Sequence, residues 1–140
     1  MDWSKDSKYL RAIDQAYAKL FYDVTAKEQV TEGQSTLTDI NMWAHGTCKL
    51  GWEVMGVFPQ GADGTDVNAV DTTPDKKVIA VGDDFGSVCI YKAPVLKNTQ
   101  ACRRMTGHSE HVPRARFWNN EGSNDRYIIS CGGNDRTYIQ

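Results

Sequence analysis

The sequence has 140 residues and a formal net charge of −2; 40% of its residues are hydrophobic and 24% are charged, which suits one ordinary globular domain or a piece of a larger one. No apolar run approaches the roughly 18 residues needed to span a bilayer, and the N-terminus has no apolar signal segment. The four cysteines are scattered without a C-x-x-C pair, which argues against a disulfide framework or a zinc site and favours a reduced, cytosolic protein.

Residues 1–42 predict strands joined by turns. Ser4–Ser7 has turn composition, since Asp and Ser side chains bond to their own backbone. Strands are expected at Tyr9–Ile13 and Lys19–Val24. A helix over Lys8–Val24 is the alternative, because Ala, Gln, Lys and Leu favour helices. No continuous apolar stripe at helical spacing runs through that segment, and its end has strand composition, so we predict strands.

Residues 25–65 are the least regular part of the chain, and 43–65 within them stand apart from the repeat. They hold two tryptophans, Trp43 and Trp52, and two short strand candidates, Thr47–Leu50 and Val54–Phe58. The segment ends in a Pro- and Gly-rich run that breaks regular structure. Two interpretations stay open: an extra hairpin packed against a neighbouring sheet, or an atypical repeat unit.

The remainder repeats one plan twice. The expected strands of the two copies are Val67–Val70, Val78–Val81, Val88–Tyr91, Val112–Phe117, Tyr127–Ser130 and Thr137–Ile139. Asp75 lies in the first turn of one copy and Asp125, in the turn at 123–125, lies 50 positions later. Asp6 matches Asp75 and Asp125 in the first segment, and Asp84 and Asp135 are separated by 51 positions. A period of this length is typical of propeller blades.

We therefore predict an all-β fold, a partial β-propeller with about three four-stranded antiparallel blades plus an atypical inserted segment. The expected parts are a first blade at 1–42, an insertion or half-blade at 43–65, a second blade at 66–106 and a third at 107–140. The first blade is expected to be truncated at its start and the third at its end. Because an open wedge of blades leaves sheet edges unpaired, we expect the chain to be a segment of a longer protein.

Four motifs occur in order along the chain: Leu50–Pro59 (LGWEVMGVFP), Asp63–Val70 (DGTDVNAV), Gly82–Gly86 (GDDFG) and Gly107–Val112 (GHSEHV). Together they resemble the C-terminal part of the WD40 region of the echinoderm microtubule-associated protein-like family, over nearly the whole chain. The resemblance implies two propellers packed in tandem, of which this chain would supply the last blades. It also implies microtubule binding, with some relatives built into ciliary microtubules.

WD-type blades carry a buried polar network made by a His, a Ser or Thr, a turn Asp and a Trp. The matching residues here are His108, Ser130 and Asp135 in the last blade and Asp84 in the preceding one. In that preceding blade Tyr91 stands where Trp is usual and Asp63 where His is usual, so a full network is not expected there. These residues are interpreted as structural, because each buried polar group needs a partner.

Charge is unevenly distributed. Residues 1–91 hold 8 basic and 14 acidic side chains, whereas residues 92–116 hold 6 basic and 1 acidic. Solvated charges on an outer strand would explain this segment, and so would a surface that docks on acidic tubulin. The candidate partner surface consists of Arg103, Arg104, Arg114 and Arg116. The alternative is that tubulin contacts lie elsewhere and these blades only complete the propeller.

Enzymatic candidates are weak. Asp83 and Asp84 are adjacent in a turn, so their side chains point apart. His108 and His111 lack the Cys or carboxylate cluster that would complete a metal site. No phosphate loop or nucleophile motif occurs, and the basic segment lacks the interleaved aromatics of a nucleic-acid platform. We expect no enzyme, cofactor, metal, membrane or nucleic-acid function.

The functional prediction is a non-catalytic, microtubule-associated WD40 propeller segment that binds or stabilises microtubules. The expected partners are tubulin, other cytoskeletal or axonemal proteins and the remainder of its own propeller. The expected location is the cytoplasm and its microtubule cytoskeleton, including the cilium. The alternative is a general WD40 scaffold in a non-tubulin complex, which the composition of a pull-down would distinguish.

Overall fold

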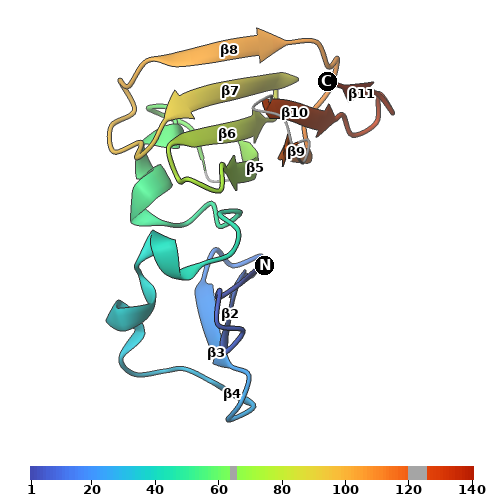
Figure 1. Ribbon diagram of the computed structural model, residues 1–140. Coiled ribbons are helices and arrows are strands. Elements are labelled where there is room, and N and C mark those ends of the chain that lie inside the picture. Colours follow the sequence, from blue (N-terminus) through green and yellow to red (C-terminus); the bar gives the residue numbers. More distant parts are fainter. Residues whose placement is uncertain (64–65, 120–125) are drawn as a thin grey trace.

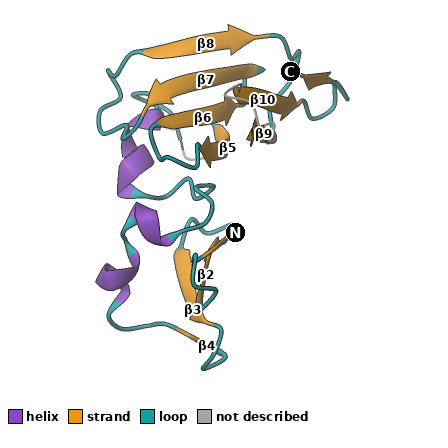
Figure 2. Ribbon diagram, viewed as in Figure 1, coloured by secondary structure: helices purple, strands orange, loops and turns teal. Residues whose placement is uncertain are grey.

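The computed structural model describes residues 1–63, 66–119 and 126–140, and in these ranges the chain forms three antiparallel sheets. Three short 3₁₀ helices lie between the first sheet and the second (Figure 1). The second and third sheets lie side by side, and the first sheet lies at the other end of the helical segment (Figure 2). The all-β, partial-propeller prediction is confirmed by this arrangement. The helices are short connections, of which Trp52–Val57 also packs against the second sheet.

The first sheet has the strand order β1 (Asp2–Trp3), β2 (Tyr9–Ile13), β3 (Lys19–Asp23) and β4 (Glu28–Gln29). The helix alternative for this region is therefore wrong. The turn before β2 forms because Asp6 Oδ1 accepts hydrogen bonds from the Ser4 hydroxyl (2.6 Å) and the Lys8 N–H (3.1 Å).

The connection from the first sheet to the second contains η1 (Gln34–Leu37), η2 (Ile40–Met42) and η3 (Trp52–Val57). The strand candidates at Thr47–Leu50 and Val54–Phe58 are wrong, since the first has no regular structure and the second is largely helical. The cause is spacing. Val54 and Val57 lie three residues apart, so one turn of 3₁₀ helix buries both against the same core.

The second sheet has the order β5 (Val67–Thr72), β6 (Val78–Asp83), β7 (Ser87–Lys92) and β8 (Cys102–Thr106). Five of the six residues in β5 are buried, whereas every residue of β8 is exposed. The inner strand therefore has neighbours on both faces, and β8 forms the outer margin of the molecule (Figure 1).

The third sheet has the order β9 (Arg114–Asn119), β10 (Arg126–Cys131) and β11 (Tyr138–Ile139). It has three strands in the described residues, one fewer than a complete blade. The expected turn at 123–125 lies outside the described residues. Cys131 on β10 is half-buried, whereas Cys89 on β7 is buried.

Alternation along β6 sends its side chains into two different cores. Ile79 and Val81 pack with Val54 and Val57 of the connecting segment. Ala80 faces the other way, into a core that it shares with the third sheet. The small residue suits this side because the two neighbouring sheets approach closely. A third core in the first sheet is built around Phe21, Leu37 and Trp43.

Candidate partner surface and blade network

The loop between β8 and β9 places His108 inside a polar network of the third sheet. Its Nε2 lies 2.9 Å from the Ser130 hydroxyl, and its Nδ1 lies 2.7 Å from the Thr137 hydroxyl and 3.2 Å from Asp135 Oδ2. The His108 side chain is only 2% exposed. The structure thus brings together His108, Ser130 and Asp135, the set expected from the sequence. The sequence analysis did not include Thr137 in this network, although its position two residues after Asp135 could have indicated it.

Asp135 organises the turn that faces His108. Partial burial raises its pKa, but hydrogen bonds donated by the backbone and hydroxyl of Thr137, the Ser109 N–H and His108 outweigh it, so that the pKa of Asp135 is lowered overall. The Thr137 N–H and the Ser109 N–H each lie 3.0 Å from the carboxylate oxygen that they contact. The carboxylate therefore ties the loop before β9 to the turn before β11.

Asp84 makes a different contact from the one expected. Its carboxylate accepts a hydrogen bond from the Asn68 side chain on β5, at 2.5 Å. The turn between β6 and β7 is organised instead by Asp83, whose Oδ1 accepts from the N–H groups of Phe85 (3.0 Å) and Ser87 (2.8 Å). Gly86 in that turn has φ +78°, and a Cβ there would lie 2.2 Å from the His108 carbonyl oxygen. The turn thus needs glycine both for its backbone conformation and for its contact with the next loop.

The four arginines of the candidate partner surface do not form one continuous edge. Arg103 and Arg104 lie on β8, the outer strand of the second sheet, whereas Arg114 and Arg116 lie on β9, the inner strand of the third. The order of strands in the sheets, which the sequence does not reveal, places Arg103 and Arg104 apart from Arg114 and Arg116. The outer pair and the inner pair are therefore separate candidate surfaces.

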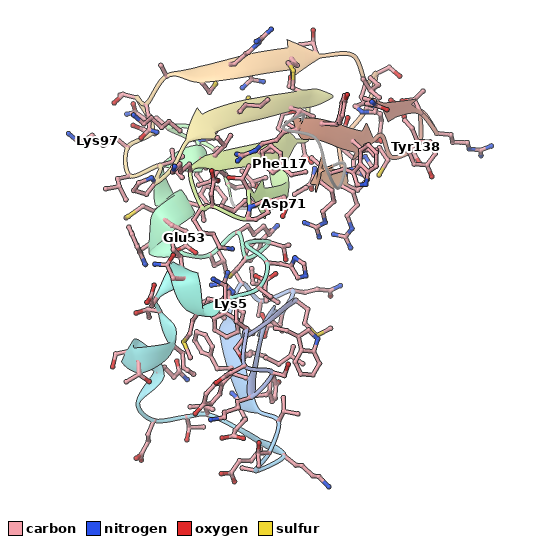
Figure 3. The ribbon with its side chains drawn as sticks, in the orientation of Figure 1. Lys5, Glu53, Asp71, Lys97, Phe117 and Tyr138 are labelled. Carbon is pink, nitrogen blue, oxygen red and sulfur yellow. The ribbon has the colours of Figure 1, made fainter. Side chains whose placement is uncertain are left out.

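The two arginines of the outer pair, Arg103 and Arg104, differ in whether an acidic side chain already pairs with them. Arg104 Nη1 lies 2.7 Å from Asp83 Oδ2, and its side chain is 49% exposed. Arg103 is exposed and, among the described residues, has no ion pair. Lys97, also exposed, lies in the loop before β8 at the outer end of the second sheet (Figure 3). Arg103 and Lys97 therefore present positive charge that is available to a partner.

In the inner pair, Arg116 has an acidic partner, whereas Arg114 is exposed and has no ion pair among the described residues. Arg116 Nη1 lies 3.5 Å from Asp71 Oδ1 and donates to the Val70 carbonyl oxygen at 3.2 Å. Asp71 Oδ2 also accepts from the Phe117 N–H at 2.9 Å, so these two labelled residues lie together in Figure 3. Burial raises the pKa of Asp71, although Phe117 and Arg116 oppose the shift. Arg114 and Arg116 line a polar cavity of about 280 Å³ beside β5.

A buried charged cluster that the sequence did not reveal joins the first sheet to the connecting segment. Arg11, on β2, lies 2.9 Å from Asp2 through its Nε and 3.7 Å from Glu53 through its Nη1. Its guanidinium carbon lies 4.6 Å from the centre of the Trp43 ring. The Thr47 hydroxyl donates to Asp2 at 2.6 Å. Arg11 thus anchors the connecting segment by charge, ring contact and packing.

A family model described as "Echinoderm microtubule-associated protein second beta-propeller" matches residues 1–140. The chain belongs to the echinoderm microtubule-associated protein family. It is 38% identical over all its 140 residues to human Echinoderm microtubule-associated protein-like 4, of which it covers 14%. It is 37% identical over the same length to Ciliary WD repeat-containing protein ctxp80 of Euplotoides octocarinatus, of which it covers 19%. The chain therefore spans less than a fifth of either relative.

Membership of the echinoderm microtubule-associated protein family agrees with the resemblance drawn from the four motifs. Among the described residues, no group of three or more His, Cys, Asp or Glu side chains is placed to hold a metal ion. Within those same ranges no helix is long and apolar enough to cross a membrane.

One contact between blades in this family member should depend on pH. Asp75, in the turn after β5, accepts hydrogen bonds from the Thr73 hydroxyl (2.7 Å) and from Arg126 Nη2 on β10 (3.0 Å). These hydrogen bonds lower the pKa of Asp75 to about 2. Because the folded pKa lies below the unfolded value, the carboxylate stabilises the fold above about pH 4, and this stabilisation disappears as the pH falls toward 2.

We therefore expect Asp75→Asn to make the unfolding midpoint less sensitive to pH between pH 4 and 2. Urea unfolding at a series of pH values measures this. Arg126→Gln is the matched variant, and it should weaken the same pH dependence while leaving the Thr73 contact in place. Identical pH profiles for Asp75→Asn and the unaltered protein would show that this contact does not contribute.

Proposed function

We propose that this chain is a non-catalytic propeller segment of a microtubule-associated protein, which binds tubulin and stabilises microtubules. The observation that carries the proposal is the match of the whole chain to the second propeller of a family named for microtubule association. A relative named as ciliary supports a structural role on ciliary or axonemal microtubules as well as in the cytoplasmic cytoskeleton. Other cytoskeletal proteins are further proposed partners.

The outer strand β8 and the loop before it form the proposed tubulin-docking surface. The surface of tubulin is strongly acidic, so positive side chains that are exposed and not already paired give the largest electrostatic gain on docking. Arg103 and Lys97 meet this condition, whereas Arg116 is engaged by Asp71. Of the inner pair only Arg114 meets it, so Arg114 and Arg116 are proposed as the weaker candidate.

Reversing the charge of the outer surface tests the proposal. We expect the double variant Lys97→Glu/Arg103→Glu to weaken binding to stabilised microtubules about tenfold, with a smaller effect at high salt because salt screens exposed charges. Co-sedimentation of the protein with microtubules at two ionic strengths gives the measurement. Neither residue has an ion pair in the described part of the chain, so folding should be preserved.

The matched control is Lys8→Glu/Lys27→Glu, which makes the same change of charge at exposed positions of the first sheet. It should leave binding within about twofold, since a change of net charge alone acts weakly and without a defined site. Equal losses in both double variants would contradict the docking surface. A protein that fails to sediment with microtubules, and instead recovers a complex without tubulin from a pull-down, would favour the general scaffold.

A further inference from the structure

The last residue of β8, Thr106, is preceded by Arg103 three positions earlier and Arg104 two positions earlier. It is the only Ser or Thr in the sequence with arginine at both of these positions. Arginine-directed protein kinases recognise such a segment through acidic pockets that accept both guanidinium groups, an instance of specificity set by complementary charge. The sequence thus gives Thr106 a recognition pattern that none of the other hydroxyl side chains has.

The structure makes this segment accessible. A kinase binds its substrate as an extended chain, and β8 is already extended and lies at the outer margin of its sheet (Figure 1). All five of its residues are exposed, and in the second sheet it is paired only with β7. The chain leaves the sheet at exposed Gly107, directly after Thr106. By contrast, hydroxyl groups such as Ser130 and Thr73 are buried.

We propose that Thr106 is a phosphorylation site for an arginine-directed Ser/Thr kinase. In the reaction the Thr106 Oγ1 attacks the γ-phosphorus of ATP and forms the new P–O bond. The bond from that phosphorus to the β,γ-bridging oxygen breaks, and ADP leaves. The hydroxyl proton passes to the catalytic aspartate of the kinase and then to solvent. No further reactant is required.

The consequence for docking rests on the proposed function. A phosphate adds about −1.5 to −2 charges at neutral pH. Placed at Thr106, it lies on the same short strand as Arg103, whose charge is unpaired among the described residues, and as Arg104, which Asp83 already pairs. It therefore more than offsets the positive charge that this strand offers to a partner. The outer surface then loses its attraction for an acidic partner. Phosphorylation of Thr106 therefore releases the protein from microtubules.

The modification is tested by incubating the protein with the catalytic subunit of cyclic-AMP-dependent protein kinase and ATP. Mass spectrometry of the native protein is expected to find one phosphate, on Thr106. Arg103→Gln should lower kcat/KM for the kinase at least tenfold, and Thr106→Ala should abolish incorporation. Thr99→Ala, at an exposed threonine without preceding arginines, should not alter it. Phosphate placed mainly elsewhere, or accepted by Thr106 only after denaturation, would overturn the proposal.

The consequence is tested separately by co-sedimentation of the phosphorylated and unmodified proteins with microtubules. Phosphorylation is expected to weaken binding at least tenfold, and Thr106→Ala treated with the kinase should bind like the unmodified protein. Binding that is unchanged by stoichiometric phosphate on Thr106 would overturn the switch. Failure of the unmodified protein to bind would instead overturn the proposed function, while the mass-spectrometric result would still decide whether Thr106 is the site.

Discussion

Replacing Arg11 with methionine is expected to lower the free energy of unfolding by about 3–5 kcal/mol, because it leaves two buried carboxylates without their cation. The side chains of Arg11, Asp2 and Glu53 are 4%, 0% and 8% exposed. Water therefore cannot take over the role of the guanidinium. Since whole domains are stable by only about 5–15 kcal/mol, the loss should be severe. Chemical denaturation followed by tryptophan fluorescence measures it, and Trp43 lies within the affected cluster.

Lys8→Met is the matched control for the Arg11 variant. Lys8 lies 4.0 Å from Asp6, and the two side chains are 66% and 49% exposed. Exposed pairs of this kind contribute about 0–1 kcal/mol, so the control should remain close to the unaltered protein. Replacing the whole cluster, with Asp2→Asn, Arg11→Met and Glu53→Gln together, should recover part of the loss. Similar stabilities for the Arg11 and Lys8 variants would show that the buried cluster does not hold the first sheet in place.

Replacing His108 with alanine is expected to cost about 2–4 kcal/mol, since both of its ring nitrogens have buried or half-buried partners. The change leaves the hydroxyls of Ser130 and Thr137 and the carboxylate of Asp135 without the imidazole. Thermal or denaturant unfolding measures the cost. This loss of stability should leave the charge of the docking surface unchanged, because His108 lies inside the third sheet.

His111→Ala provides the comparison for His108. His111 contacts Glu110 on the surface, where its side chain is 36% exposed, so its loss should cost less than about 1 kcal/mol. If the two histidine variants were equally stable, the network around His108 would be dispensable. A selective loss at His108 would support its interpretation as a structural residue of the blade.

Most strands were predictable because their signals are local, but β4 and β8 were not among the expected strands. The apolar run Val78–Val81 and the Asp- and Gly-containing turns around it indicate a buried strand and its boundaries without tertiary information. The segment 43–63 was not, because the spacing of Val54 and Val57 favours a 3₁₀ turn only once it is known that both pack into the same core. Contacts with a distant loop add to this: the Val95 N–H donates to the Glu53 carbonyl, and the Gly56 N–H donates to the Val95 carbonyl. A strand at this place could not make both contacts.

The functional residues were predictable to different degrees. His108, Ser130 and Asp135 could be placed by resemblance, because they keep fixed positions relative to the repeat. Arg11 could not, since an arginine in the middle of a strand usually faces solvent and nothing nearby in sequence reveals Asp2 and Glu53 as partners. The grouping of the arginines failed for a similar reason. Proximity in sequence does not show that β8 is an outer strand and β9 an inner one.

Zero-length carbodiimide cross-linking of the protein on microtubules, read by mass spectrometry, tests the docking surface most directly. This reagent joins a lysine to a carboxylate only when the two are in contact. Lys92 and Lys97 are exposed at the end of β7 and in the loop before β8, whereas Lys8 and Lys27 are exposed on the first sheet. Cross-links from Lys92 or Lys97 to tubulin carboxylates are the predicted result. Cross-links to tubulin that come only from Lys8 and Lys27 would contradict it.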